Sequence, residues 1–118
     1  MAADISKTAD IAGFIGACLV DSDTGLMLTS EGGGRLDLET AAALNAKVVN
    51  AQLQMINTLE LDDNIDDLLI SLGKQIHLVH PLPSRPEVFV YVILDRKTAN
   101  LGMARLQVRN IAQSITFG

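Results

Sequence analysis

Two segments of this chain carry apolar side chains on both faces of an extended strand, and this feature limits the fold more than any other. One is the stretch Phe14–Asp21 and the other is residues 88–94. Side chains alternate between the two faces of a strand, so an unbroken apolar run has both faces buried. Such strands lie in the middle of a sheet that is covered by helices on each side. We therefore expect these two strands to be neighbours at the centre of one sheet.

Strict alternation also predicts which residues share a face in these two strands. One face of the first strand receives Phe14, Gly16, Cys18 and Val20, and the other receives Ile15, Ala17 and Leu19. In the second strand, the even-numbered residues Val88 to Leu94 oppose Phe89, Tyr91 and Ile93.

The remaining elements complete an α+β pattern within a single domain that spans residues 1–118. Three further strands are expected at residues 26–31, 67–72 and 75–82, and their short turns predict an antiparallel sheet. A short helix is expected at residues 2–11 and a long one at 38–59, capped by Asp37. The last helix is expected to begin at its N-cap Thr98 and to end near Ile115.

The composition excludes several classes of function. The net charge is −5 and only four residues are aromatic, so the chain repels phosphate backbones and offers few rings for base stacking. Nucleic acid is therefore not an expected partner. No run approaches the roughly 20 apolar residues that span a bilayer, and the start lacks a signal-peptide pattern. We expect a cytoplasmic protein without membrane insertion.

The long helix has a wider apolar surface than one sheet can cover. Its apolar residues, from Leu38 to Leu59, occupy an arc of roughly 200°, about twice the usual width. The remainder needs another surface, and a second copy of the same helix is the commonest solution. Asn45 and Gln52 lie inside this arc, one heptad apart. They either lie at the dimer interface, where polar residues fix register, or at the edge of the core, bonded to loop backbone.

Three stretches carry a resemblance to a known family. They are residues 13–21 (Gly-Phe-Ile-Gly-Ala-Cys-Leu-Val-Asp) before a glycine-containing turn, Leu68-Leu69-Ile70 before Gly73, and Asn-Leu-Gly-Met-Ala-Arg at 100–105. Together with the order of elements, they resemble the roadblock family, which includes the roadblock-type dynein light chains and their bacterial relatives. The resemblance covers about residues 12–115.

The resemblance implies a five-stranded antiparallel sheet with the long helix on one face and the C-terminal and short N-terminal helices on the other. It also implies a homodimer in which the long helices pack together and the third strands pair. Asp66 and Asp67 lie close to that strand, where a twofold axis would bring like charges together. The interface expected from the apolar arc and the resemblance comprises Leu38, Ala41, Asn45, Val48, Val49, Gln52, Met55, Ile56, Leu68 and Ile70.

Such dimers in the family act as regulators or scaffolds. The resemblance thus implies a non-catalytic homodimer that binds a small Ras-like GTPase or another signalling or motility protein, with a possible effect on GTP hydrolysis. The alternative is a small-molecule sensor or a general protein-interaction domain of the α/β sandwich type. Five arginines are candidate arginine fingers toward a GTPase, but a role as solvated surface charges is strongly favoured for each of them: Arg35, Arg85, Arg96, Arg105 and Arg109.

No residue pattern predicts an enzyme, a cofactor or a metal site. His77 and His80 are an odd number of residues apart on one strand and so face opposite sides. Cys18 lies in a two-sided apolar strand and is expected to be a buried hydrophobic residue. Residues 32–34, three consecutive glycines before the long helix, are interpreted as a flexible connection, because the Gly-Lys-Ser/Thr ending of a nucleotide loop is missing.

Overall fold

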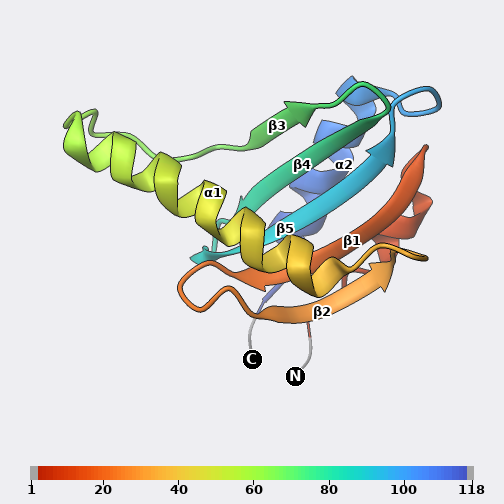
Figure 1. The fold of residues 1–118 in the computed structure, drawn as a ribbon, viewed down its shortest axis with the longest axis horizontal. Helices are drawn as coiled ribbons and strands as arrows, with labels where there is room; N and C mark the ends of the chain where they lie inside the picture. Colours follow the sequence, from red (N-terminus) through yellow and green to blue (C-terminus); the bar gives the residue numbers. More distant parts are fainter. Residues whose placement is uncertain (1–2, 117–118) are drawn as a thin grey trace.

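The computed structural model describes residues 3–116 and contains one five-stranded antiparallel sheet (Figure 1). The strand order is β2-β1-β5-β4-β3, so the first two strands form one hairpin and the last three form a meander beside it. The strands are β1 (Phe14–Asp21), β2 (Met27–Gly32), β3 (Leu68–Ser71), β4 (Gln75–Leu82) and β5 (Arg85–Asp95).

The two strands with apolar residues on both faces lie side by side at the centre of the sheet, as predicted. β1 pairs with β5 from Phe14 opposite Leu94 to Asp21 opposite Val88. Residues 16–20 of β1 and 88–94 of β5 are all buried. The α+β class and the five-stranded antiparallel sheet are confirmed.

One part of the predicted facing pattern is wrong, at the start of β1. Phe14 pairs with Leu94 and Gly16 pairs with Ile93, so Ile15 is an extra residue in the ladder. This bulge reverses the alternation. Phe14 consequently packs on the side of the C-terminal helix, and Ile15 packs on the side of the long helix.

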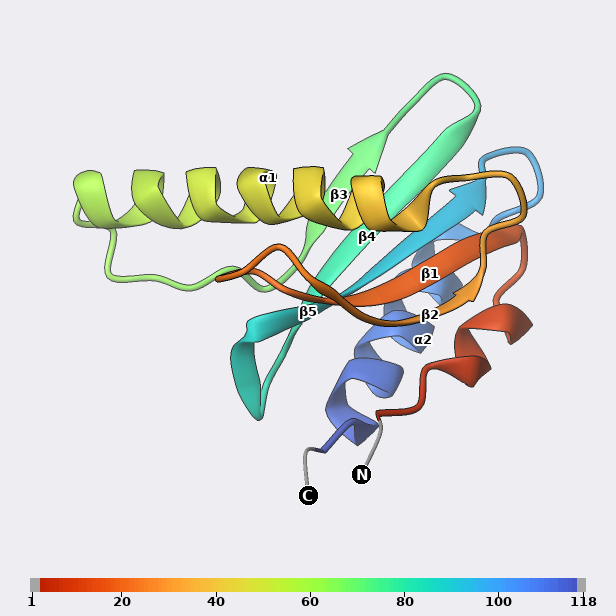
Figure 2. The same ribbon diagram turned by 60° about the horizontal axis from the view of Figure 1, so that its bottom comes forward.

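Helices cover both faces of the sheet (Figure 2). The long helix α1 (Leu38–Thr58) lies on one face, and α2 (Leu101–Ser114) lies on the other with the 3₁₀ helix η1 (Ser6–Asp10) beside it. The short helix expected over residues 2–11 is thus shorter than predicted, and residue 2 lies outside the described residues. Two apolar cores result, one on each face of the sheet.

The N-caps of the two α-helices differ in how well they were predicted. Asp37 caps α1 as expected, because its Oδ1 accepts a hydrogen bond from the Thr40 amide at 3.0 Å. The cap of α2 is Asn100 and not Thr98. The Asn100 Oδ1 accepts from the Met103 amide at 3.1 Å, while the Thr98 hydroxyl donates to Asp95 in the preceding turn.

Gly32 and Gly33, which precede α1, are tightly packed, so the interpretation of residues 32–34 as a flexible connection does not hold for these two residues. The Gly33 amide donates to the Ile15 carbonyl at 2.9 Å. A Cβ atom on Gly16 would lie 2.7 Å from the Gly33 Cα, and a Cβ on Gly33 would lie 2.7 Å from the Leu38 side chain. Gly33 also has a φ of +97°, where other residues are strained. Backbone contact here fixes where α1 begins.

This packing predicts a large cost for one added methyl group. Gly33→Ala should lower the free energy of unfolding by about 2 kcal/mol or more, because strain at positive φ and overpacking against Leu38 act together. Urea denaturation measures the change. Gly73→Ala is the control, since a Cβ there meets nothing within 4 Å. Equal stability of the two variants would contradict tight packing at Gly33.

Candidate interaction surface

The second half of α1 extends past the edge of the sheet. The buried residues of the helix are Leu38, Ala42, Ala46 and Val49, and its backbone lies nearest to β1 and β2. After Val49 the helix continues to Thr58 with no further buried residue, and in Figure 1 this end projects beyond the strands. We call residues 50–58 the overhang of α1.

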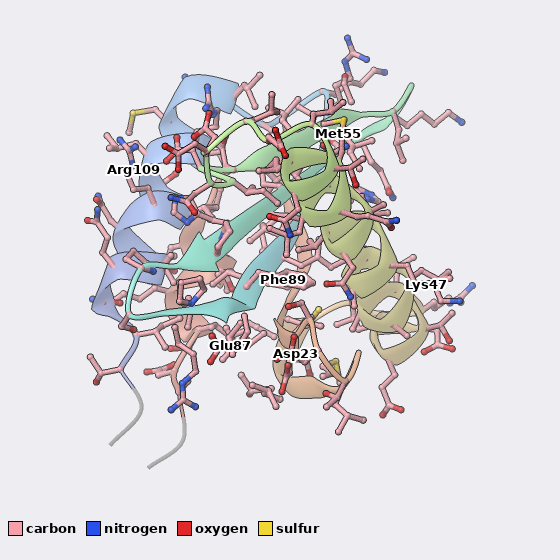
Figure 3. The ribbon with its side chains drawn as sticks, turned by 90° about the vertical axis from the view of Figure 1, so that its left-hand side faces the viewer. Asp23, Lys47, Met55, Glu87, Phe89 and Arg109 are labelled. Atoms are coloured by element: carbon pink, nitrogen blue, oxygen red, sulfur yellow. The ribbon has the colours of Figure 1, made fainter. Side chains whose placement is uncertain are left out.

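A row of exposed apolar side chains follows the side of α1 that does not face the sheet. Leu44, Val48 and Met55 are 54%, 38% and 45% exposed, and Ala51 is also exposed. Their spacing of four, three and four residues is that of a coiled-coil seam. These four residues, which we call the outer stripe, lie roughly 140° around the helix from the buried row. Figure 3 shows Met55 on this helix, together with Lys47.

The structure divides the ten predicted interface residues into three groups. Leu38 and Val49 are 7% and 3% exposed, because they pack against the sheet of their own chain. Val48 and Met55 are exposed on the outer stripe. Six are half-buried, four on α1 and two on β3: Ala41, Asn45, Gln52, Ile56, Leu68 and Ile70.

Strand β3 forms one edge of the sheet beside this helix face. It pairs with β4 from Leu68 opposite Val79 to Ser71 opposite Ile76, and no strand of residues 3–116 pairs with its other edge. Leu68 packs on the same side of the sheet as α1. A short open edge next to an apolar helix face can accept a strand from another chain.

Asn45 belongs to a chain of hydrogen bonds at the margin of the core. Its side-chain amide donates to the Ala41 carbonyl at 2.8 Å and also bonds to the Tyr91 hydroxyl. That hydroxyl lies 2.8 Å from Nδ1 of His77, and Nε2 of His77 lies 2.9 Å from the Gln75 side-chain oxygen. Asn45 therefore lies at the edge of the core of its own chain, and its partners there are its own helix and β5, not the loop backbone that one alternative expected.

Burial affects the ionisation of both rings in this chain. It raises the pKa of Tyr91 and lowers the pKa of His77, because the charged form of each loses solvation. The neutral His77 ring accepts from the Tyr91 hydroxyl through Nδ1 and donates through Nε2 to Gln75. Protonation of Nδ1 would remove the acceptor that the Tyr91 hydroxyl uses.

The lowered pKa of His77 predicts a pH dependence of stability. The ring binds its proton less readily in the folded chain than in the unfolded one, whose pKa is about 6.5. Stability from this group is complete above that pH and decreases as the pH falls through the lower folded value. Between about pH 7.5 and pH 5.5, the wild type should lose more free energy of unfolding than His77→Gln. Parallel pH profiles of the two proteins in urea denaturation would refute this role of His77.

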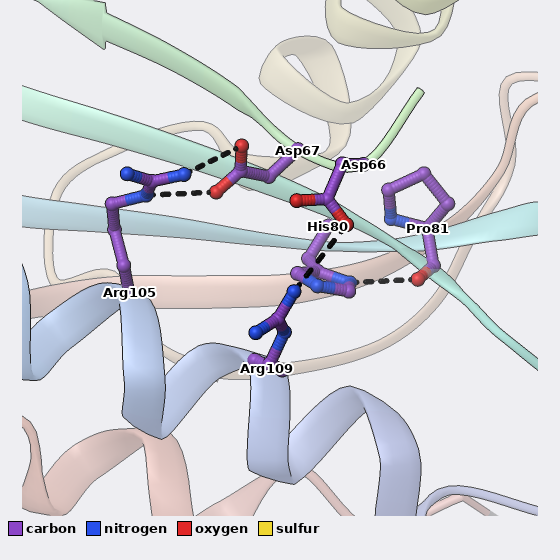
Figure 4. Close-up of polar contacts among 6 residues, drawn as sticks. All are labelled: Asp66, Asp67, His80, Pro81, Arg105 and Arg109. Carbon is purple, nitrogen blue, oxygen red and sulfur yellow. Dashed lines mark hydrogen bonds and ion pairs between the residues drawn. The ribbon is translucent and has the colours of Figure 1, made fainter. Parts of the chain in front are cut away.

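A second polar cluster joins the segment before β3 to helix α2 (Figure 4). Arg105 donates to both oxygens of Asp67, at 2.9 and 3.1 Å, and Arg109 lies 3.6 Å from Asp66. The pairing with Asp67 raises the pKa of Arg105. These residues line a cavity of about 240 Å³ together with His80 and Leu106. Nδ1 of His80 donates to the Pro81 carbonyl at 2.8 Å. The cluster fastens the connection between α1 and β3 to the opposite face of the sheet.

The same cluster bears on the candidate arginine fingers. Arg105 and Arg109 have carboxylate partners, and Arg96 donates to the Leu72 carbonyl at 2.9 Å. Arg85 lies 3.6 Å from Glu87, and Arg35 is exposed before α1. The structure gives none of the five a position that selects it for GTP hydrolysis.

The remaining candidate residues are explained by packing. Cys18 is fully buried, and burial raises its pKa to about 12, so the thiol stays protonated near neutral pH. His77 and His80 occupy opposite faces of β4, as predicted. Within residues 3–116 no three histidine, cysteine or acidic side chains gather closely enough to hold a metal ion. Of the helices in this range, none has the length and apolar character needed to cross a membrane.

Comparison with known proteins gives the fold a name. No protein-family model and no curated protein matches the sequence. Among solved structures, MglB of Myxococcus xanthus aligns with a TM-score of 0.78 and 24% identity, covering 91% of this chain and 84% of that one. A Roadblock/LC7 domain from Streptomyces avermitilis aligns with a TM-score of 0.78, 14% identity and coverages of 91% and 86%.

A third similar structure is the gliding protein MglB from Thermus thermophilus, with a TM-score of 0.77, 18% identity and coverages of 91% and 78%. At these identities the similarity is one of fold. The chain has a roadblock-type fold, which confirms the fold that the resemblance of its sequence implied.

Proposed function

We propose that this chain is a non-catalytic regulatory or scaffold module of the cytoplasm, which works as a homodimer and binds a small Ras-like GTPase or another signalling or motility protein. The observation that carries the proposal is the outer stripe of α1 beside the open edge of β3. The outer stripe is apolar and the outer edge of β3 is unpaired, and a second copy of the chain would cover both. The roadblock-type fold supports the same arrangement.

The proposed interface differs in part from the ten residues expected from sequence. It comprises the outer stripe, the half-buried side chains next to it and strand β3, while Leu38 and Val49 remain in the core of each subunit. Leu44 and Ala51 join it because they continue the seam that Val48 and Met55 define. In this arrangement the two β3 strands pair across the twofold axis and extend the sheet.

The pairing of Asp66 and Asp67 with arginines favours such a dimer. Like charges near a twofold axis would weaken strand pairing. Here Asp67 is held by Arg105 and Asp66 by Arg109, on the side of the sheet that carries α2. Their charges are therefore compensated and directed away from the helix face where the second copy would pack.

A matched pair of substitutions tests the dimer. Gln52→Glu places a new carboxylate on the half-buried side of α1, whereas Gln54→Glu makes the same change two residues later on the exposed side. The first should raise the dissociation constant of the dimer by about tenfold or more, because its charges approach across the axis, and the second should leave it unchanged. Light scattering over a concentration series measures both. A wild-type monomer, or equal effects of the two variants, would contradict the proposal.

The partner is tested by binding and by nucleotide turnover. The chain should co-purify with a small Ras-like GTPase of its own organism when the GTPase carries either GDP or a GTP analogue. It should also change the rate at which that GTPase hydrolyses GTP or exchanges its nucleotide. The Gln52→Glu variant should bind more weakly if the dimer is the binding unit. If no such GTPase binds and none changes its turnover, the GTPase part of the proposal is refuted.

A further inference from the structure

A groove lies beneath the overhang of α1, away from the outer stripe. It has a volume of about 340 Å³. Val49 and Leu53 line it from α1, Ile65 from the connection to β3, and three prolines from the β4–β5 hairpin: Pro81, Pro83 and Pro86. In Figure 2 the overhang, this connection and the hairpin occupy the same end of the molecule. Leu53 is 38% exposed, although it lines this apolar surface.

The groove is separate from the proposed dimer interface. Leu53 and Met55 are two residues apart on one helix, so their side chains point in directions that differ by roughly 160°. A second copy packed on the outer stripe would therefore leave the side of α1 that carries Leu53 uncovered. Each subunit of the dimer would carry one such groove, and its apolar lining would remain available to a different molecule.

The connection that forms one wall of the groove carries negative charge. Residues 60–67 contain five acidic residues and no basic one. Asp66 and Asp67 are paired with arginines, but Glu60, Asp62 and Asp63 are exposed and take part in none of the ion pairs found among residues 3–116. The last turn of α1 also lacks a basic residue. The negative end of the helix dipole therefore adds to the potential of these carboxylates.

We propose that this groove binds a segment of the partner protein in which an apolar side chain is flanked by lysine or arginine. The apolar side chain would enter between Leu53, Ile65 and the prolines, and the basic side chains would meet the carboxylates of residues 60–63. The volume lies within the roughly 300–1,000 Å³ of ligand pockets. Prolines limit the motion of one wall, which reduces the entropy lost on binding. The inference rests on the proposed function, because it describes the chemistry of the bound partner.

The charges also predict how such binding responds to salt. Attraction between exposed carboxylates and a basic segment acts over about 8–10 Å at moderate ionic strength and is screened when salt is added. The apolar contact with Leu53 is not weakened in this way. Binding should therefore weaken as salt increases, and it should be abolished by loss of the apolar side chain at any salt concentration.

A random 12-residue peptide library displayed on phage provides the test, with the full-length chain as the target. The recovered peptides should share an apolar residue next to lysine or arginine, and fluorescence anisotropy should give their dissociation constants. We expect Leu53→Gln to weaken binding at least tenfold. The control is Leu101→Gln, which changes the same residue type at nearly the same exposure, 39% against 38%, on the other face of the sheet.

A second pair of variants tests the charges. Asp62→Asn combined with Asp63→Asn should also weaken binding at least tenfold, and asparagine suits the positive φ of 51° at residue 62. Asp10→Asn combined with Asp23→Asn removes the same charge elsewhere and should have no effect. Thermal unfolding monitored by circular dichroism would show that all four proteins remain folded.

Three results would overturn the inference. The first is a library that yields no peptide for the wild type, and the second is recovered peptides that are acidic or neutral, or that bind Leu53→Gln as well as the wild type. The third is dissociation of the dimer by Leu53→Gln in light scattering, which would assign the groove to a second copy of the chain. A monomeric wild type or an absent GTPase would refute the proposed function instead, and the peptide result would stand apart from it.

Discussion

The pairing of β1 with β5 is the contact on which the rest of this structure depends. Both strands are buried on both faces, so each face of the sheet must carry a helical layer. β2 pairs with β1 on one side of this central pair, and β4, followed by β3, pairs with β5 on the other side. Because the backbone of Gly33 packs on the β1 ladder, α1 must begin above β1 and β2. A helix of 21 residues that starts there is longer than the sheet beneath it.

The overhang of α1 follows from that length, and it gives one helix two different exposed sides. The outer stripe has the spacing of a helix-to-helix seam, which suits an identical helix. The other side, at Leu53, is not covered by a helix and forms one wall of a groove with proline and acidic neighbours. Under the proposed function, a symmetric partner and an asymmetric one could thus bind the same helix at once.

Sequence patterns within single elements predicted most of the fold. The features that they did not predict depend on contacts between distant elements. The apolar runs at residues 16–20 and 88–94 were sufficient to place β1 beside β5. The bulge at Ile15 was not predictable, because it depends on the register with β5. A helical wheel gave the width of the apolar arc on α1, but it could not tell which part faces the sheet, so Leu38 and Val49 were assigned to the interface. The groove was also missed, because its walls come from three separate segments.

The ion pairs of Arg105 and Arg109 link these two surfaces. They join residues that are 38 and 43 positions apart in the sequence, so no local sequence pattern predicts them. Exposed pairs contribute little to stability, typically below about 1 kcal/mol each, so their main effect is on position. They direct Asp66 and Asp67 toward α2, and alternation along the strand then turns Leu68 and Ile70 toward the side of α1. Ile65, next to Asp66 in the same connection, lines the groove, so the position of one short connection affects both the open edge of the sheet and one wall of the groove.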